Sequence, residues 1–419
     1  MSLTRTQLDA AAEALRLTLK FDRPADSVLH DYFRGQRALG GRERAFVADA
    51  VYGVLRRKRT VDYLAPGGAP RQLLLAYLAR IAGVSIRELA GATNPGEQSW
   101  LAEVKAKSLE GLPLPVRAEL PDWVVEQLGR YHTETEMLAL ARGLNEPAPM
   151  DLRVNTLRAE REAVRRELAA SGIEAALTPY SPAGLRVKGR PSINRHPLFL
   201  SGAIEVQDEG SQLLCHLVAP RRHDLVVDFC AGAGGKSLML GALMHSQGRI
   251  YAFDVSVARL NRLKPRLRRS GLSNLFPHAI AEVNDIRVKR LAGKIDRVLV
   301  DAPCSGLGTL RRNPDLKWRQ SPQSVEELKA KQAAILRAAA RLLKPGGRLV
   351  YATCSLLAGE NENIVAAFLA ERGDFRQLDC AGILREARIA LDTGPLLRLY
   401  PHAHGTDGFF AAVLECIPR

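Results

Sequence analysis

Residues 225–237 read Leu-Val-Val-Asp-Phe-Cys-Ala-Gly-Ala-Gly-Gly-Lys-Ser. The apolar start of this stretch predicts a buried parallel strand, and an apolar helix is predicted from Leu238 to Met244. A strand, a glycine-rich turn and a helix in this order hold a nucleotide-like ligand near the helix N-terminus. Strand-like and helix-like segments then alternate over residues 207–419. The chain therefore predicts an α/β fold with a mostly parallel, doubly wound sheet.

Two phosphate-binding motifs are close to the glycine-rich turn, and each lacks one required glycine. A P-loop needs glycine where this chain has Cys230, and a dinucleotide fingerprint needs glycine where it has Ser237. The remaining glycines still let the backbone approach a ligand closely, and they do not require that ligand to carry phosphate.

Acidic residues follow four successive predicted strands. Asp228, Asp254 and Asp301 each end a strand, and Asp285 follows a weaker strand over residues 275–280. A carboxylate at the end of the second strand is well placed to accept hydrogen bonds from ribose hydroxyls. Four acids directed at one cleft suit S-adenosylmethionine, which has an adenosine and an amino acid tail but no phosphate. Each aspartate alone is equally typical of a helix N-cap or a turn.

Two cysteines fifty residues apart carry the candidate chemistry. Cys304 lies in Asp-Ala-Pro-Cys-Ser at 301–305, and Cys354 lies in Tyr-Ala-Thr-Cys-Ser at 351–355. Each follows an apolar run that predicts a parallel strand, so both thiols are expected at the sheet edge where open α/β folds keep their active sites. The alternative is a pair of structural cysteines, because free cysteine is among the most buried residues.

These motifs resemble those of the Sun/Nop family of RNA cytosine-C5 methyltransferases, over about residues 145–419. The matching stretches are Asp-Phe-Cys-Ala at 228–231, Asp-Ala-Pro-Cys-Ser-Gly at 301–306, Asn-Pro-Asp-Leu-Lys-Trp at 313–318, Tyr-Ala-Thr-Cys-Ser at 351–355, Glu-Asn-Glu at 360–362 and Thr-Asp-Gly-Phe-Phe at 406–410. The nearest branch is the bacterial Sun (RsmB-type) group, which acts on 16S ribosomal RNA. One departure is Gly232-Ala233, where the family usually has Ala-Pro.

The resemblance implies a class I, Rossmann-like methyltransferase with S-adenosylmethionine as its cofactor. The expected cofactor-binding residues are Cys230, Ala231, Gly232, Ala233, Gly234, Gly235, Lys236, Asp254, Asp285 and Asp301. From residue chemistry alone, either cysteine can attack cytosine C6. The resemblance assigns the attack to Cys354 and assistance of its release to Cys304. Asp301 is expected to bond the N3 and N4 edge of the base, with a proton on Asp301 or on N3 that offsets the charge of the adduct. The thiol of Cys230 is interpreted as a packing group.

Composition favours a polyanionic partner. Lys and Arg total 60 against 45 acids, which gives a net charge of +15. Basic clusters occur at Arg56–Arg59, Arg259–Arg269 and Arg311–Arg319. A solvated helix face is the alternative for any one of them, and for Arg56–Arg59 it is about equally favoured. The six cysteines show no Cys-x-x-Cys pair, so no metal site is expected. Without a signal peptide or an apolar run of membrane length, we expect a cytoplasmic monomer with reduced thiols and no membrane partner.

Three domains are predicted along the chain. Residues 1–112 form a helical domain that resembles the NusB-like domain of bacterial relatives. Residues 113–206 form a helical linker, with one helix over 121–141, and a small α+β module that resembles an RNA-recognition fold and binds RNA. Residues 207–419 form the S-adenosylmethionine-dependent methyltransferase domain, with a late antiparallel strand at Phe409–Cys416.

Methylation of cytosine C5 in 16S ribosomal RNA is the function that these features favour. The first alternative is a tRNA-directed enzyme of the same chemistry, which the sequence does not separate from the first hypothesis. The second is a catalytically inactive RNA-binding factor in ribosome assembly. The presence of Cys354, Cys304, Asp301 and Lys236 argues against an inactive protein.

Overall fold

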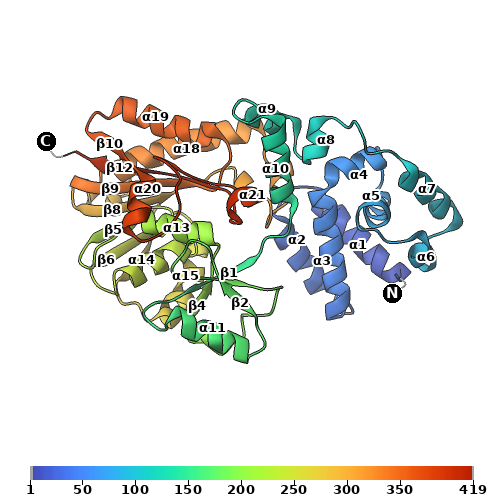
Figure 1. Cartoon of the computed structure of the whole chain (residues 1–419), viewed down its shortest axis with the longest axis horizontal. Coiled ribbons are helices and arrows are strands. Elements are labelled where there is room, and N and C mark those ends of the chain that lie inside the picture. Colours follow the sequence, from blue (N-terminus) through green and yellow to red (C-terminus); the bar gives the residue numbers. More distant parts are fainter. Residues whose placement is uncertain (1–2, 418–419) are drawn as a thin grey trace. The chain divides into compact units, whose positions relative to one another are not determined.

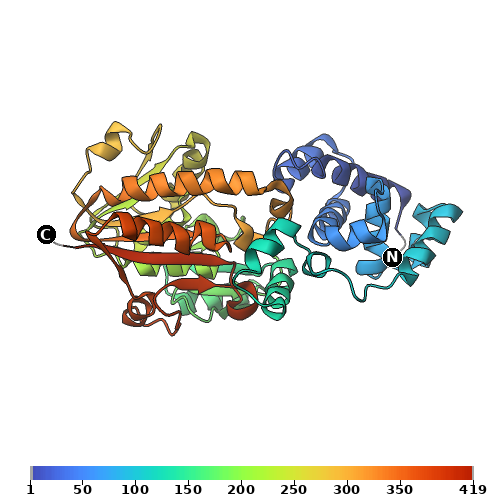
Figure 2. The same cartoon turned by 90° about the horizontal axis from the view of Figure 1, so that it is seen from above.

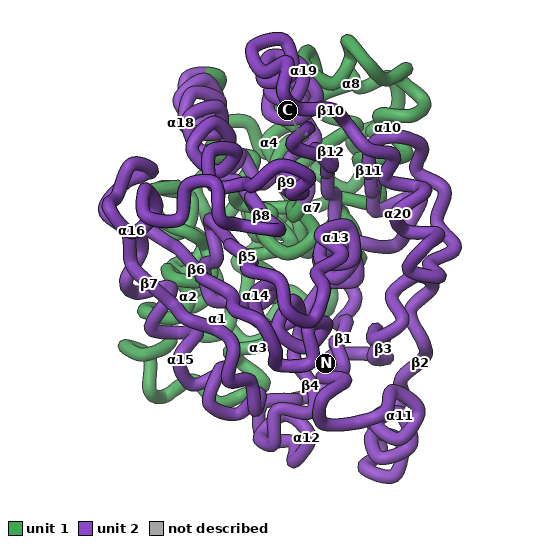
Figure 3. The backbone as a smooth tube through the Cα atoms, turned by 90° about the vertical axis from the view of Figure 1, so that its left-hand side faces the viewer, with its two compact units in different colours: residues 1–147, 309–322 green, residues 148–308, 323–419 purple. Residues whose placement is uncertain are grey.

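The computed structural model describes residues 3–417 and divides into two compact units (Figure 3). The first unit contains residues 1–147 and 309–322, and the second contains residues 148–308 and 323–419. The boundaries predicted after residues 112 and 206 do not coincide with this division. The helices between residues 114 and 145 belong to the helical unit, whereas the small α+β module belongs with the large sheet.

Helices build the first unit, and those of its amino-terminal part pack around one apolar core (Figure 2). Fully buried residues of this core include Leu15, Val51 and Leu74. The elements are α1 (Arg5–Thr18), α2 (Ala25–Gly35), α3 (Gly41–Arg56), α4 (Lys58–Leu64), α5 (Pro70–Ala76), the π-helical turn η1 (Tyr77–Ile81), α6 (Ile86–Leu89), η2 (Ala90–Ala92), α7 (Pro95–Ala106), α8 (Leu114–Ala118), α9 (Asp122–Leu128), α10 (Glu134–Asn145) and α17 (Leu316–Arg319).

The single helix predicted over residues 121–141 is wrong, because two helices, α9 and α10, occupy this region. Gly129 follows the end of α9, and Thr133 begins α10 with a reciprocal cap. The Thr133 hydroxyl accepts a hydrogen bond from the Glu136 backbone N–H, and the Glu136 carboxylate accepts one from the Thr133 N–H. Such a capping box starts a new helix.

The segment 309–322 is an interior part of the helical unit. The indole Nε1 of Trp318 donates to the carbonyl of Leu55 at 2.9 Å, and Lys317 Nζ donates to the carbonyl of Arg56 at 3.1 Å. Lys317 and Arg311 are buried, and burial lowers the pKa of Lys317 to about 7. These two residues of the predicted basic cluster over 311–319 are therefore buried inside the helical unit.

A large mixed sheet forms the second unit, with the strand order β10-β12-β9-β8-β5-β6-β7 and β11 beside β12. The strands are β5 (Leu225–Asp228), β6 (Arg249–Asp254), β7 (Leu275–Ala279), β8 (Ile295–Asp301), β9 (Leu343–Thr353), β10 (Phe375–Leu378), β11 (Leu397–Leu399) and β12 (Phe409–Cys416). The ladder from β9 through β8, β5 and β6 to β7 is parallel, and β12 pairs with β9 antiparallel, as the sequence predicts.

Helices cover both faces of this sheet (Figure 1). One face packs on α13 (Glu209–Val218), α14 (Gly235–Leu243), α15 (Val257–Ser270) and α20 (Cys380–Glu386). The other face packs on α16 (Ile286–Lys289), α18 (Pro322–Ala340) and α19 (Glu362–Glu371). Side chains alternate along each strand, so Leu299 of β8 joins the first core and Val298 joins the second. The remaining helical turns are α12 (Pro197–Leu200), η3 (Leu307–Thr309), η4 (Ala358–Glu360) and α21 (Pro401–His404).

A smaller antiparallel sheet precedes the large one, with the strand order β2-β3-β1-β4. It consists of β1 (Met150–Val154), β2 (Ala175–Leu177), β3 (Gly184–Val187) and β4 (Ile204–Val206), and α11 (Arg161–Ala170) packs on it. The sequence predicts this α+β module. None of the helices over residues 3–417 is long and apolar enough to cross a membrane.

Candidate active site

The two cysteines meet at the carboxyl ends of neighbouring strands. Strands β8 and β9 run parallel with Asp301 opposite Ala352, so the loops that follow them leave the sheet side by side. Cys304 Sγ and Cys354 Sγ lie 3.4 Å apart, within hydrogen-bonding distance. The hydrogen bond with Cys354, together with burial, raises the pKa of the Cys304 thiol well above its ordinary value. Cys304 is therefore a thiol that keeps its proton.

A cavity of about 330 Å³ lies at these strand ends, a volume within the range of small-molecule sites. Its walls are mainly apolar, with two aspartates, one arginine and three thiols among them. The lining residues are Phe229, Cys230, Asp254, Val255, Arg259, Ile280, Val283, Asp301, Ala302, Pro303, Cys304, Ile335 and Cys354. Both candidate catalytic cysteines and Asp301 thus face one space, as the sequence predicts.

Asp301 is held by Lys236 from the first turn of α14. Lys236 Nζ lies 2.7 Å from Asp301 Oδ2, and the Lys236 and Asp301 side chains are 14% and 30% exposed. Burial alone would lower the pKa of Lys236, but the charge and the hydrogen bond of Asp301 outweigh it and raise that pKa. The ammonium of Lys236 therefore stays charged and fixes the carboxylate at the cavity wall.

The glycine-rich turn supports Asp254. Its carboxylate accepts hydrogen bonds from the Gly232 N–H at 2.8 Å and the Ser256 N–H at 2.7 Å, one on each oxygen. Gly232 has φ +57°, a left-handed backbone conformation that favours glycine. Each carboxylate oxygen keeps a further acceptor site for a ligand in the cavity.

Of the predicted loop residues 230–236, Cys230 is the one among the described residues that lines this cavity. Two arginines donate hydrogen bonds to backbone carbonyls of the loop. Arg153 of β1 donates to the Gly235 carbonyl at 2.6 Å, and Arg266 of α15 donates to the Ala233 carbonyl at 2.7 Å. These bonds tie the glycine-rich turn to the small α+β module and to α15. Direct cofactor contacts by the loop residues stay a prediction.

Asp285 lies in the loop after β7 and caps α16. Its carboxylate accepts hydrogen bonds from the Ala281 and Arg287 N–H groups, and the Arg287 guanidinium lies 3.3 Å from it. These hydrogen bonds lower the pKa of Asp285. Asp285 is not among the lining residues of the cavity, so its predicted cofactor contact also stays a prediction.

Asp228 is one of the four strand-end acids expected at the cleft, but it was not among the expected cofactor-binding residues. It is buried beneath the cavity wall, and Ser237 Oγ donates to its Oδ2 at 2.6 Å. Its Oδ1 has no hydrogen-bond partner among the described residues. Burial raises the pKa of Asp228 to about 7. The sequence pattern that could have assigned Asp228 to the site is its position at the end of the strand that precedes the glycine-rich turn.

Three arginines of α15 lie close to acidic residues of the protein itself, which the clustering of basic residues in the sequence did not predict. Arg259 lines the cavity and lies 3.5 Å from Asp254 Oδ2. Arg266 and Arg269 form ion pairs with Glu205 of β4, at 2.9 and 2.6 Å. The predicted RNA-facing cluster over residues 259–269 is therefore partly committed to contacts within the protein.

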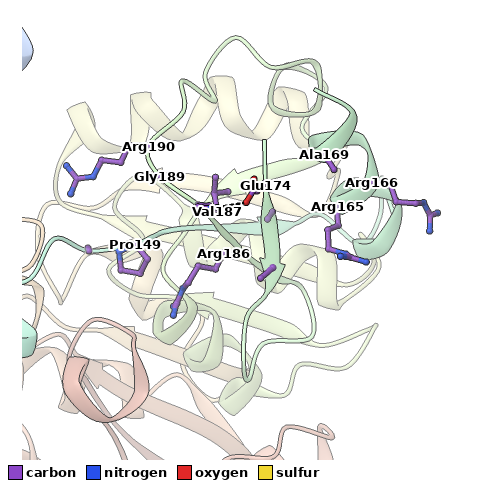
Figure 4. A pocket seen from close by; sticks show the side chains of 13 residues that line it. Pro149, Arg165, Arg166, Ala169, Glu174, Arg186, Val187, Gly189 and Arg190 are labelled. Carbon is purple, nitrogen blue, oxygen red and sulfur yellow. Dashed lines mark hydrogen bonds and ion pairs between the residues drawn. The ribbon is translucent and has the colours of Figure 1, made fainter. Parts of the chain in front are cut away.

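A larger hollow of about 840 Å³ lies on the small α+β module (Figure 4). Several of its basic side chains are neutralised by neighbouring acids, as in the pair of Lys188 with Glu174 at 2.8 Å and that of Arg165 with Glu162 at 2.8 Å. Arg166 and Arg190 lie at opposite ends of the hollow and point outward (Figure 4). Its lining residues include neither cysteine nor histidine. The smaller cavity at the strand ends is therefore the candidate active site.

Comparison with known proteins identifies the family of this chain. Residues 215–415 match the family of 16S rRNA methyltransferases RsmB/F, and residues 120–194 match the ferredoxin-like domain of that family. The probable ribosomal RNA small subunit methyltransferase B of Synechocystis sp. is 33% identical over 407 residues, which are 89% of this chain and 91% of the relative. The chain belongs to the RsmB/F family of 16S rRNA methyltransferases. The predicted resemblance to the RsmB type is confirmed, and the chain is an rRNA methyltransferase.

Solved structures share the fold of this chain. The crystal structure of PH0851 superposes with a TM-score of 0.79 and 27% identity, over 99% of both chains. NSun6 from Pyrococcus horikoshii with SFG gives a TM-score of 0.64 at 22% identity, over 71% of this chain and 99% of that one. The predicted fold is thus confirmed: a class I, Rossmann-like methyltransferase domain, a helical amino-terminal region and a small α+β module that is ferredoxin-like.

Proposed function

We propose that the chain methylates C5 of a cytosine in 16S ribosomal RNA through a covalent bond between Cys354 and C6 of the base. The observation that carries this proposal is the pair of thiols 3.4 Å apart on the wall of a cavity that also contains Asp301. A methyltransferase acting on an unactivated ring nitrogen or a hydroxyl has no need of two adjacent thiols. A cytosine-C5 enzyme does need a thiol, because C5 alone is too weak a nucleophile.

S-adenosylmethionine is the cofactor, and the residues at the strand ends fit it. Asp254 keeps acceptor sites for ribose hydroxyls, and the apolar walls, which include Phe229, Ile280 and Val283, suit an adenine ring. When bound, the cofactor supplies the methyl group that C5 takes up.

The proposed reaction begins with attack of Cys354 on C6 of the cytosine. Its thiolate adds to C6, the C5–C6 double bond becomes an electron pair at C5, and C5 then acts as the nucleophile. Asp301, fixed by Lys236, faces the same cavity and accepts a hydrogen bond from the N4 amino group of the base. Its bond to N3 requires a proton on N3 or on Asp301, and that proton offsets the charge of the adduct. The base has to leave its stack to reach these groups, which is easiest in single-stranded or looped RNA.

Release requires loss of the C5 proton to a base and departure of the Cys354 sulfur. The electron pair of the C5–H bond restores the C5–C6 double bond as the bond from C6 to sulfur breaks. Cys304 lies 3.4 Å away, and its raised pKa keeps it a protonated thiol. It can therefore donate a hydrogen bond to the departing sulfur and stabilise the developing thiolate.

Two single substitutions test this division of roles. Cys354→Ala should abolish methylation and any covalent adduct, whereas Cys304→Ala should attack and methylate but stall with RNA attached. The stalled species should survive denaturing electrophoresis and disappear after nuclease treatment. Cys416→Ala is the matched control, because this cysteine ends β12 and does not line the cavity. An adduct in Cys354→Ala with none in Cys304→Ala would show that the two roles are reversed.

The RNA target is tested separately. Bisulfite sequencing of total RNA from a deletion strain should reveal the loss of one methylated cytosine in 16S ribosomal RNA. Loss at a tRNA position, or no change in any RNA, contradicts the proposed substrate.

A further inference from the structure

A buried carboxylate joins the two cysteine loops. Glu360 is fully buried, and its side chain accepts four hydrogen bonds. Oε1 accepts from the Ser305 N–H at 2.8 Å and from Gln332 Nε2 at 3.0 Å. Oε2 accepts from the hydroxyls of Ser305 and Ser355, both at 2.5 Å. Since Ser305 follows Cys304 and Ser355 follows Cys354, one side chain grips both loops next to their thiols.

Further hydrogen bonds hold Glu360, which bridges the two cysteine loops, and its neighbours in place. Tyr351 of β9 donates its hydroxyl to the Glu360 carbonyl at 2.7 Å. Gln332 of α18 also donates to the Pro303 carbonyl at 2.9 Å, one residue before Cys304. Asn361 Nδ2 donates to the Ser355 carbonyl at 3.1 Å. Glu360 therefore cannot shift without moving the two strand ends and α18 with it.

We infer that Glu360 is the positioning residue that sets the separation of the Cys304 and Cys354 thiols. The inference rests on the proposed function, in which both thiols act on one base. Glu360 is not among the lining residues of the cavity, so it acts through the loops rather than by touching RNA or cofactor. Each loop contributes a serine hydroxyl to the same carboxylate oxygen, and those two hydroxyls lie 3.1 Å apart.

The charge of Glu360 adds to its geometric role. Glu360 contributes to the raised pKa of Cys304, after the hydrogen bond with Cys354, burial and the charge interaction with Cys354. A negative charge on this side of the pair favours the protonated form of the thiol that assists release. The two effects of Glu360 can be separated by substitution. Glu360→Ala removes the hydrogen bonds that join the two cysteine loops, whereas Glu360→Gln removes only the negative charge.

Glu360→Ala removes the bridge, whereas Glu360→Gln keeps it. A glutamine oxygen still accepts from Ser305 N–H and Gln332, and its amide nitrogen donates to the two serine hydroxyls, which can accept. We expect kcat to fall at least a hundredfold in Glu360→Ala and less than tenfold in Glu360→Gln, with the KM for S-adenosylmethionine within twofold in both. Glu362→Gln is the matched control, because Glu362 pairs with Arg398 at the surface and should leave kcat unchanged.

Disulfide trapping measures the thiol separation without RNA or cofactor. Diamide takes two electrons and two protons from the thiols, its azo bond is reduced to a hydrazine, and a Cys304–Cys354 disulfide forms. Quantified by peptide mass spectrometry, the trapping rate should match the native chain in Glu360→Gln and fall at least tenfold in Glu360→Ala. Ser355→Ala removes one of the bonds that join the loops and should slow trapping severalfold, which keeps a readout if Glu360→Ala fails to fold.

Two results would overturn the inference. One is an unchanged trapping rate in folded Glu360→Ala or in Ser355→Ala. The other is a kcat for Glu360→Ala within threefold of the native value. Failure of the proposed function is a different outcome, because an RNA adduct that persists in Cys354→Ala would refute the chemistry and leave the trapping rates as they are.

Discussion

Replacing Lys236 with methionine removes the cation that holds Asp301 and keeps the apolar stem of the side chain. The Lys236 Nζ to Asp301 Oδ2 distance is 2.7 Å, and both side chains are less than one third exposed. A charge-assisted hydrogen bond of this kind contributes about 2–3 kcal/mol. Because each 1.36 kcal/mol changes a rate tenfold, we expect kcat/KM for RNA to fall about 30- to 160-fold.

Initial rates of methyl transfer from radiolabelled cofactor to ribosomal RNA measure this loss. Lys344→Met is a matched control, because Lys344 forms an ion pair with Asp296 near the opposite end of β8. That variant should keep kcat/KM within about twofold, since a pair with an exposed lysine contributes roughly 0–1 kcal/mol. If Lys236→Met retained kcat/KM within threefold of the native enzyme, the assignment of Asp301 to the catalytic machinery would be refuted.

Three further changes test the cofactor site, the buried acid and the RNA surface. Asp254→Ala should weaken S-adenosylmethionine binding about ten- to a hundredfold in calorimetric titration, and unchanged affinity would remove Asp254 from the site. Burial raises the pKa of Asp228 to about 7, so the folded chain holds a proton that the unfolded chain releases near 3.9. The stability contributed by this proton is full below about pH 4 and is lost as pH rises through about 7, a change on the order of 4 kcal/mol. In urea unfolding across that range, Asp228→Asn should flatten this loss, and the same pH dependence as the native chain would contradict the prediction. Reversing the charges of the exposed Arg262 and Arg268 on α15 should lower the slope of log affinity for RNA against log salt by about 1–2, and an identical slope would mean that they face away from RNA.

The strands that carry the site were predictable because central parallel strands are apolar on both faces. Asp254 and Asp301 end β6 and β8 as predicted, and the antiparallel pairing of β12 with β9 agrees with the prediction drawn from the family resemblance. Membership of residues 309–322 in the helical unit was not predictable. It depends on contacts such as that between Trp318 and Leu55, which are far apart in the sequence and leave no local pattern.

The site shows the same contrast between local and distant determinants. Two thiols at neighbouring strand ends could be placed from the apolar run before each cysteine. Asp285 was assigned to the cofactor site because it also follows a predicted strand. In the structure it lies beyond the end of β7 and caps the short helix α16. Glu360 stands in a motif that the sequence displays, yet its role depends on two loops fifty residues apart that only the folded sheet brings together.

The helical unit takes in a segment from far along the chain, and this ordering has a consequence for synthesis on the ribosome. Residues 1–147 emerge first, but the indole of Trp318 and the rest of residues 309–322 follow only when residue 322 has been made, 322 − 147 = 175 residues later. At about 5–20 residues per second this delay is roughly 9–35 s. During that interval the nascent helices lack an interior partner, and Leu55 of α3 presents a backbone carbonyl with no indole to bind it. The last step in assembling the amino-terminal unit is therefore timed by translation of the catalytic one.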